Sequence, residues 1–289
     1  MRRKATFAWL TVVVVVAGLI VGGGAWLLNS VRGAFVPSLA VGCTATVGES
    51  SYWLAVDQSE NAALISGLAI QRGMPARAAS IALATALQES KLRNIDYGDL
   101  DSVGLFQQRP SQDWGTVAQI MDPVYSANAF YDVLAQVPDY VNLPINDAAQ
   151  IVQRSGFPHA YAQHEPLSRA FASALTGQTP QGLNCTLPPA AAGSHPETVI
   201  ATAQVALGQL PMHAGESNTV VIDAGDAFGW MAAHWALANA QSLGIVQIDY
   251  EGLRWNRAAT QDGENLGWQP TDAAGTGIVT LTLAPPAVA

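Results

Sequence analysis

The stretch Pro75-Ala-Arg-Ala-Ala-Ser-Ile-Ala-Leu-Ala-Thr-Ala-Leu-Gln-Glu-Ser-Lys91 is the most informative part of the sequence. Pro75 suits the first turn of a helix, where its missing N–H would have no partner within the helix. Beyond Arg77 the stretch is small or apolar on nearly every face, which is typical of a helix buried inside a domain. We therefore predict a central helix over residues 75–91.

Glu89 is the only acidic residue of this helix and lies in its last turn. Burial disfavours the carboxylate, and so does the partial negative charge at a helix C-terminus, so both raise the pKa. A carboxylic acid that stays protonated near neutral pH can act as a general acid on a leaving oxygen. The alternative is a frayed, solvated helix end, at which Glu89 lies beside Lys91 and Arg93.

Helix signals continue on both sides of this segment. Further helices are predicted over about 59–72, 122–136, 147–156 and 165–177. Residues 98–115 are rich in Gly, Asp, Ser and Pro, which predicts an irregular insert after the central helix. Residues 43–186 are thus expected to form a mainly α domain.

Three short motifs follow one another closely in this region. Gln88-Glu89-Ser90 is followed by Tyr97-Gly98-Asp99 and then by Gly104-Leu105-Phe106-Gln107. Together they resemble the lysozyme-like superfamily, and within it the goose-type lysozymes and soluble lytic transglycosylases, over residues of about 50–180. The resemblance implies a lysozyme-like domain that cleaves the glycan strands of peptidoglycan without a cofactor.

The same resemblance assigns roles to the acidic residues. It makes Glu89 the catalytic acid. It makes Asp99 the candidate second carboxylate, which in goose-type enzymes helps to position water, with Asp101 as the alternative. Without the resemblance, Asp99 and Asp101 read equally well as acids that cap turns in a Gly-Asp loop.

Other matching positions are candidates for substrate binding. The resemblance places Gln107 beside the sugar subsite and Ser102 near the turn of the loop, and Tyr161 matches a tyrosine that hydrogen-bonds near the catalytic glutamate. The sequence departs from the family where Gln153-Arg154-Ser155-Gly156 replaces a Tyr-Asn-Ala-Gly stretch. This departure puts the placement of substrate in doubt.

Two chemical outcomes are open for such a site. A second carboxylate about 6.5–9.5 Å across the site would activate water for inverting hydrolysis. If Glu89 acts alone, the C6 hydroxyl of the sugar attacks instead and an anhydro ring closes. Four aromatic side chains either line a saccharide groove or belong to the core, namely Trp114, Phe106, Tyr125 and Tyr131.

The C-terminal part of the sequence has a different pattern from the helical region at residues 43–186. Residues 187–196 have the composition of a linker, and residues 197–289 mix helix and strand signals, which predicts a small α+β domain. Ala238-Asn239-Ala240 faintly resembles a module found beside wall-active domains, but the His-x-His strand of that module is missing here. No metal site is predicted there or elsewhere, because His159 and His164 lack the i,i+4 spacing of helix-borne ligands.

The N-terminus predicts a membrane anchor over residues 1–33. From Phe7 to Leu28 there are 22 uncharged, mostly apolar residues after Arg2-Arg3-Lys4. Such a run is about 33 Å long as a helix, enough to cross a bilayer. By the positive-inside rule, the body is then extracytoplasmic. A cleaved signal peptide and a lipoprotein anchored at Cys43 are the alternatives.

The two cysteines, Cys43 and Cys185, predict one disulfide in an oxidising compartment, with two buried free thiols as the alternative.

The charge of the chain excludes one class of partner. Four of the 13 basic residues lie in the first 33 positions, which hold no acid, so the remaining chain carries nine basic against 22 acidic residues. So acidic a body should repel nucleic acid.

The sequence therefore predicts a membrane-anchored enzyme acting on peptidoglycan glycan strands, either a lytic transglycosylase or a muramidase. The alternative is a catalytically inactive peptidoglycan-binding or scaffold module of a cell-envelope assembly. The sequence indicates no protein partner.

Overall fold

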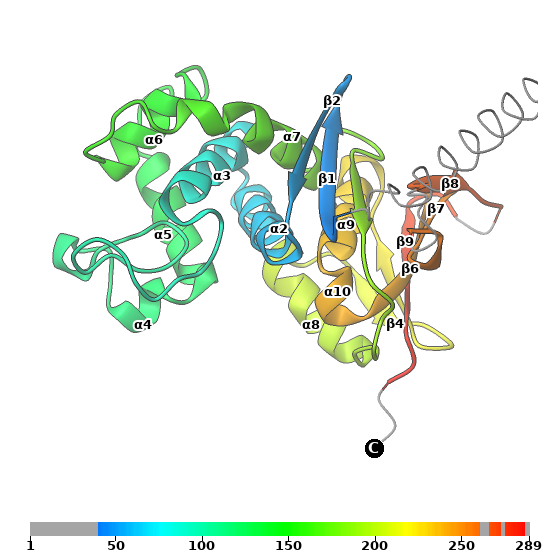
Figure 1. Ribbon diagram of the computed structural model, residues 1–289. Helices are drawn as coiled ribbons and strands as arrows, with labels where there is room; N and C mark the ends of the chain where they lie inside the picture. The colour runs from blue at the N-terminus through cyan, green and yellow to red at the C-terminus, as the bar shows by residue number, and fades with distance from the viewer. Residues whose placement is uncertain (1–39, 261–265, 273–274, 287–289) are drawn as a thin grey trace, which may run out of the picture. The chain divides into compact units, whose positions relative to one another are not determined.

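The computed structural model describes residues 40–260, 266–272 and 275–286 (Figure 1). The predicted anchor at residues 1–33, with its apolar run at 7–28, lies outside these residues. Among the described residues we find no helix with the length and hydropathy that crossing a bilayer requires. The described residues from 41 onward form one compact unit.

The helices and strands alternate along this unit. The described helices are α2 (Val56–Gln71), α3 (Ala76–Ser90), α4 (Val117–Ile120), α5 (Pro123–Leu134), α6 (Ile145–Gln153), α7 (Glu165–Leu175), α8 (Pro196–Leu207), α9 (Asp226–Ala238), α10 (Ala240–Leu243), and the 3₁₀ turns η1 (Pro110–Gln112), η2 (Ala162–His164) and η3 (Ala258–Thr260). The described strands are β1 (Gly42–Val47), β2 (Ser50–Leu54), β3 (Leu183–Thr186), β4 (Met212–Ala214), β5 (Thr219–Asp223), β6 (Ile245–Tyr250), β7 (Leu253–Asn256), β8 (Trp268–Pro270) and β9 (Ile278–Leu283).

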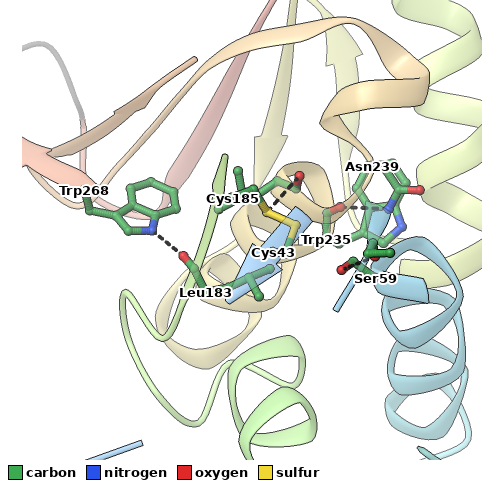
Figure 2. Close-up of a disulfide and its surroundings, with 9 residues drawn as sticks. Cys43, Ser59, Leu183, Cys185, Trp235, Asn239 and Trp268 are labelled. Atoms are coloured by element: carbon green, nitrogen blue, oxygen red, sulfur yellow. Dashed lines mark hydrogen bonds between the residues drawn. A yellow bond between two sulfur atoms is a disulfide. The ribbon is translucent and has the colours of Figure 1, made fainter. Parts of the chain in front are cut away.

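A small antiparallel sheet of order β2-β1-β3 holds the disulfide. Cys43 of β1 and Cys185 of β3 lie directly opposite each other, are fully buried, and are joined by a disulfide (Figure 2). The predicted pairing is thus confirmed. Because the bridge closes a loop of 142 residues, it should stabilise the fold by about 4–5 kcal/mol in the chain-entropy model.

A second, larger antiparallel sheet has the order β4-β5-β9-β6-β7-β8. In β9, buried and more exposed residues alternate, as the period-2 pattern at the end of the sequence predicts. Helix α9 packs on this sheet. Figure 2 shows Trp268 of β8 donating its indole N–H to the carbonyl oxygen of Leu183 in β3, at 2.9 Å, which links the two sheets.

The predicted fold class, a mainly α domain followed by a small α+β domain, is wrong. The fold is mixed α/β, with 44% helix, 18% strand and two sheets. The strands at 42–54 were not predicted from the sequence. They are short, and although β1 and β2 form a local hairpin, β1 also pairs with β3, some 140 residues later in the chain, which local sequence cannot indicate. The domain limits 43–186 and 197–289 and the linker 187–196 stay predictions, although α2 packs on both α8 and α9.

Helix α3 lies at the centre of the packing, as its sequence predicts. Every residue from Ala78 to Leu87 is buried. The helix packs most extensively against α7 and also contacts α2, α5 and α6. Alanine on several faces lets these neighbours pack closely against the helix.

Candidate active site

Glu89 lies in the last turn of α3, where the helix leaves the core. The helix stops because Lys91 adopts a left-handed conformation, with φ of 56°, and Leu92 folds back to donate its N–H to the carbonyl oxygen of Ala86 at 2.9 Å. Glu89 is half-buried, in contrast to the fully buried residues one turn earlier. Its carboxyl group thus combines partial desolvation with access to solvent.

Two neutral side chains hold the Glu89 carboxyl group. The hydroxyl of Tyr161, itself fully buried, donates a hydrogen bond to Glu89 Oε1 at 2.6 Å, and the amide of Gln153 lies close enough to favour the carboxylate. Burial raises the pKa of Glu89 and is the largest effect, while Tyr161 and Gln153 partly offset it by lowering the pKa. The pKa of Glu89 therefore stays above its usual range.

Ser90 connects the end of α3 to the Gly-Leu-Phe-Gln stretch. Its buried hydroxyl donates a hydrogen bond to the carbonyl oxygen of Leu105 at 2.7 Å and accepts one from the N–H of Arg93 at 3.2 Å. Leu105 and Phe106 are fully buried beside it. Through this contact, the Glu-Ser pair at the end of α3 is joined directly to the Gly-Leu-Phe-Gln stretch.

The loop between these motifs is tightly folded. The N–H of Gly104 donates to the carbonyl oxygen of Ile95 at 2.7 Å. Gln107 has φ of 48° and donates its side-chain amide to the carbonyl oxygen of Tyr97 at 3.2 Å. A Cβ atom at Gly98 would lie 1.8 Å from Gln107 Oε1 and 2.6 Å from the carbonyl oxygen of Ser102, and because the second atom is backbone, only glycine fits there. The Gln107 side chain thus stabilises this loop, and it stays a candidate for substrate binding.

Gln153 closes the arrangement and was missed in the sequence. Its amide Nε2 donates to the carbonyl oxygen of Phe106 at 2.8 Å, and the same side chain is near enough to Glu89 to lower the pKa of that carboxyl group. Gln153 thus joins the end of α6 to both motifs. Ser155 lies near Tyr161 and lowers the pKa of that phenol, against a larger rise from burial. The sequence signal that could have indicated Gln153 is the departure from the family at residues 153–156, a stretch whose polar side chains help to position Glu89.

The surroundings of Asp99 and Asp101 give less support for a second catalytic carboxylate. Asp99 is exposed, and its carbonyl oxygen accepts the N–H of Ser102, which is buried in the turn. Asp101 accepts hydrogen bonds from Arg109 Nε at 2.7 Å and from the N–H of Ser111 at 2.8 Å. The guanidinium and these donors hold the pKa of Asp101 well below its usual range. Asp101 therefore has the environment of a structural, turn-locking carboxylate.

The aromatic residues separate into two groups. Phe106 and Tyr131 are fully buried, with Phe106 stacked on Phe130 at 4.8 Å between ring centroids and the Tyr131 hydroxyl donating to the Ile65 carbonyl oxygen at 2.8 Å. They belong to the core. Trp114 is half-buried against that core and keeps one surface open, so it stays a candidate for stacking on a sugar.

Metal chemistry has no visible basis in this part of the chain. Among the described residues, no three His, Cys, Asp or Glu side chains gather in a way that could hold a metal ion.

The four tryptophans of the C-terminal region are buried and pack as core, namely Trp230, Trp235, Trp255 and Trp268. Asn239, in the stretch with the faint module resemblance, caps α9 by donating to the carbonyl oxygen of Trp235 at 2.8 Å (Figure 2).

A comparison of the chain with family models and another with curated proteins found no match.

Proposed function

We propose that this protein cleaves the glycan strands of peptidoglycan, as a lytic transglycosylase or a muramidase, with Glu89 as the general acid. The observation that carries the proposal is the Glu89 carboxyl group, half-buried and held by Tyr161 and Gln153. Neutral donors position the group without the permanent positive charge that would strip its proton. A carboxyl group with a raised pKa retains a protonated fraction at higher pH, as proton donation requires.

The chemistry has two steps. Glu89 protonates the glycosidic oxygen, the C1–O bond breaks, and the leaving sugar departs with a hydroxyl group. The resulting Glu89 carboxylate then accepts a proton, either from water or from the C6 hydroxyl of the retained sugar. In the first case the product is a hydrolysed end, and in the second the C6 oxygen closes an anhydro ring on C1.

The anhydro-forming route is the one that the acidic residues favour. Asp101 is bound by Arg109 and Ser111, which leaves it poorly placed to activate water. Asp99 lies on an exposed turn, and neither residue is among the groups that shift the pKa of Glu89. Glu89 acting first as acid and then as base needs no second carboxylate.

The proposal places the body of the protein outside the cytoplasm, where a disulfide such as Cys43–Cys185 is stable. Membrane attachment through residues 1–33, with the body extracytoplasmic, is part of the same proposal. Its ligand is the glycan strand, with no nucleic acid and no cofactor.

The test is glycan-strand cleavage by the full-length protein and its Glu89→Gln variant, with products identified by mass. Glu60→Gln is the matched control, because burial also raises the pKa of Glu60, a carboxyl group of α2 outside the candidate site. We expect cleavage by the parent and by Glu60→Gln, a rate about 10²–10⁴-fold lower for Glu89→Gln, and products with anhydro ends. Folded parent protein that binds glycan strands without cleaving them would contradict the proposal and favour a binding or scaffold module.

A further inference from the structure

A cavity of about 440 Å³ lies at the other end of α3, between the β1–β2 hairpin and the first turns of α3 and α7. Two guanidinium groups line it, Arg77 from α3 and Arg169 from α7. Ser50 and Tyr52 of β2 form another wall. Its volume is within the range of small-ligand sites.

The two arginines share a single carboxylate. Glu165 Oε1 lies 3.1 Å from Arg169 Nη1 and 4.0 Å from Arg77 Nη1. By contrast, other arginines of the described chain have an aspartate each, in the pairs Arg72–Asp132, Arg93–Asp57, Arg109–Asp101 and Arg254–Asp249. The cavity therefore holds one positive charge more than its acid neutralises, in a protein whose body is strongly acidic.

Arg77 has unused hydrogen-bonding capacity. One terminal nitrogen, Nη2, donates to the carbonyl oxygen of Leu143. The other, Nη1, lies 4.0 Å from Glu165 Oε1, which is longer than a hydrogen bond, so its N–H groups can donate to a bound acceptor. Next to Arg77, the first turn of α3 has no side-chain cap. The N–H of Ala78 donates to the carbonyl oxygen of Pro75 at 2.8 Å, which leaves the N–H groups of Ala76 and Arg77 for the same acceptor.

The shape and lining of the cavity specify the ligand further. Apart from the arginines and three serines, its walls are apolar or aromatic, as at Tyr52 and Ala170. Strand β2 is the edge of its sheet, where an extended chain can pair with the outer backbone groups. We propose that this cavity binds the C-terminal carboxylate of a short peptide that ends in a small apolar residue, with Arg77 and Arg169 holding the carboxylate.

This site is separate from the glycan site. Arg77 precedes Glu89 by 12 positions on the same helix, which corresponds to about 18 Å along the helix axis. The Arg77 guanidinium and the Glu89 carboxyl group are thus too far apart for one carboxylate of a ligand to contact both. Peptide binding therefore does not depend on glycan cleavage, and Glu89→Gln should bind the peptide as the parent does.

The test is a calorimetric titration of the full-length protein with N-acetyl-Ala-Ala-Ala. The free acid should bind saturably, while the same peptide with a C-terminal amide should bind at least about tenfold more weakly, because a charge-assisted hydrogen bond is lost. Arg169→Gln should weaken binding of the acid by a similar factor. Arg72→Gln, which alters an arginine outside the cavity, should leave binding unchanged.

Several results would overturn the proposal. They are equal binding of acid and amide, unchanged binding by Arg169→Gln, no binding of the acid, or inorganic phosphate binding as tightly as the peptide acid. Arg169 is 60% exposed, so its replacement should not unfold the protein, and the melting temperature checks this. Arg169→Lys keeps the charge but loses the planar fork, and binding between that of the parent and Arg169→Gln would support a carboxylate held by two guanidinium groups.

Discussion

Glu89 at the end of α3 and Asp101 in the loop that follows are both carboxyl groups, yet their surroundings give them opposite properties. Glu89 is half-buried, and its partners are the neutral side chains of Tyr161 and Gln153. Asp101 is more open to solvent and pairs with the guanidinium of Arg109. The pKa is raised in the first case and lowered in the second. The partner, more than the residue type, decides whether an acid can donate a proton or serves to lock a turn.

Cleavage should show the largest difference between the two carboxyl groups. Glu89→Gln removes the proposed acid and should lower the cleavage rate by about 10²–10⁴-fold, the usual contribution of a general acid. Asp101→Asn weakens a surface ion pair of modest worth and should change the rate by less than about threefold. Rates from released glycan ends measure both, and equal losses in the two variants would refute the distinction.

Gly98→Ala should disturb the loop that carries Asp101 and faces the site. The new methyl group would collide with Gln107 Oε1 and lie 2.6 Å from the carbonyl oxygen of Ser102, which is backbone and cannot rotate away. We expect a loss of about 1–3 kcal/mol in the free energy of unfolding, together with reduced cleavage. Gly156→Ala is the control for stability, since nothing lies within 4 Å of its added Cβ. Denaturant unfolding of both variants gives the comparison.

The same two carboxyl groups should affect stability in opposite directions. The pKa of Glu89 lies above the unfolded value of 4.5, so the folded state loses stability as the pH rises from 4.5 through the folded pKa. Glu89→Gln removes this cost and should raise the melting temperature near neutral pH. The gain should vanish below 4.5.

For Asp101 the sign is reversed. Its pKa lies below the unfolded value of 3.8, so its contribution to stability is complete above 3.8 and is lost as the pH falls toward the folded pKa. Asp101→Asn should therefore lower the melting temperature near neutral pH, and the difference should shrink in acid. Melting curves across this range test both signs, and shifts in the same direction would contradict the comparison.

The smallest expected effect comes from Tyr161→Phe. Its hydroxyl stabilises the Glu89 carboxylate, so removing it should raise the pKa of Glu89 further. The alkaline limb of the pH–rate profile for cleavage should then move to higher pH. Tyr131→Phe is the matched control, because that buried hydroxyl donates to Ile65 instead and its loss should leave the limb in place. A limb that moves to lower pH in Tyr161→Phe would contradict the role of this hydrogen bond.

Parts of the site could be predicted because their signals are local. A proline start, a run of small residues and a single acid predict α3 and place Glu89 in its last turn. Tyr161, chosen from the resemblance, does contact Glu89. Gln153 could not be found this way, because a glutamine that ends a helix has many uses and only the packing of α6 beside α3 brings it to the carboxyl group.

By itself, the sequence determined the central helix, the position of Glu89 in its last turn and the predicted pairing of two lone cysteines, since each depends on residues close in the chain or on simple counting. Only the tertiary structure decided that β1 pairs with β3 to make a second sheet, that Asp101 faces Arg109, and that Arg77 and Arg169 meet at one cavity. Periodicity and caps report local geometry. The partners that set a side chain's charge state or complete a sheet come from segments far apart in sequence, and only the folded chain brings them together.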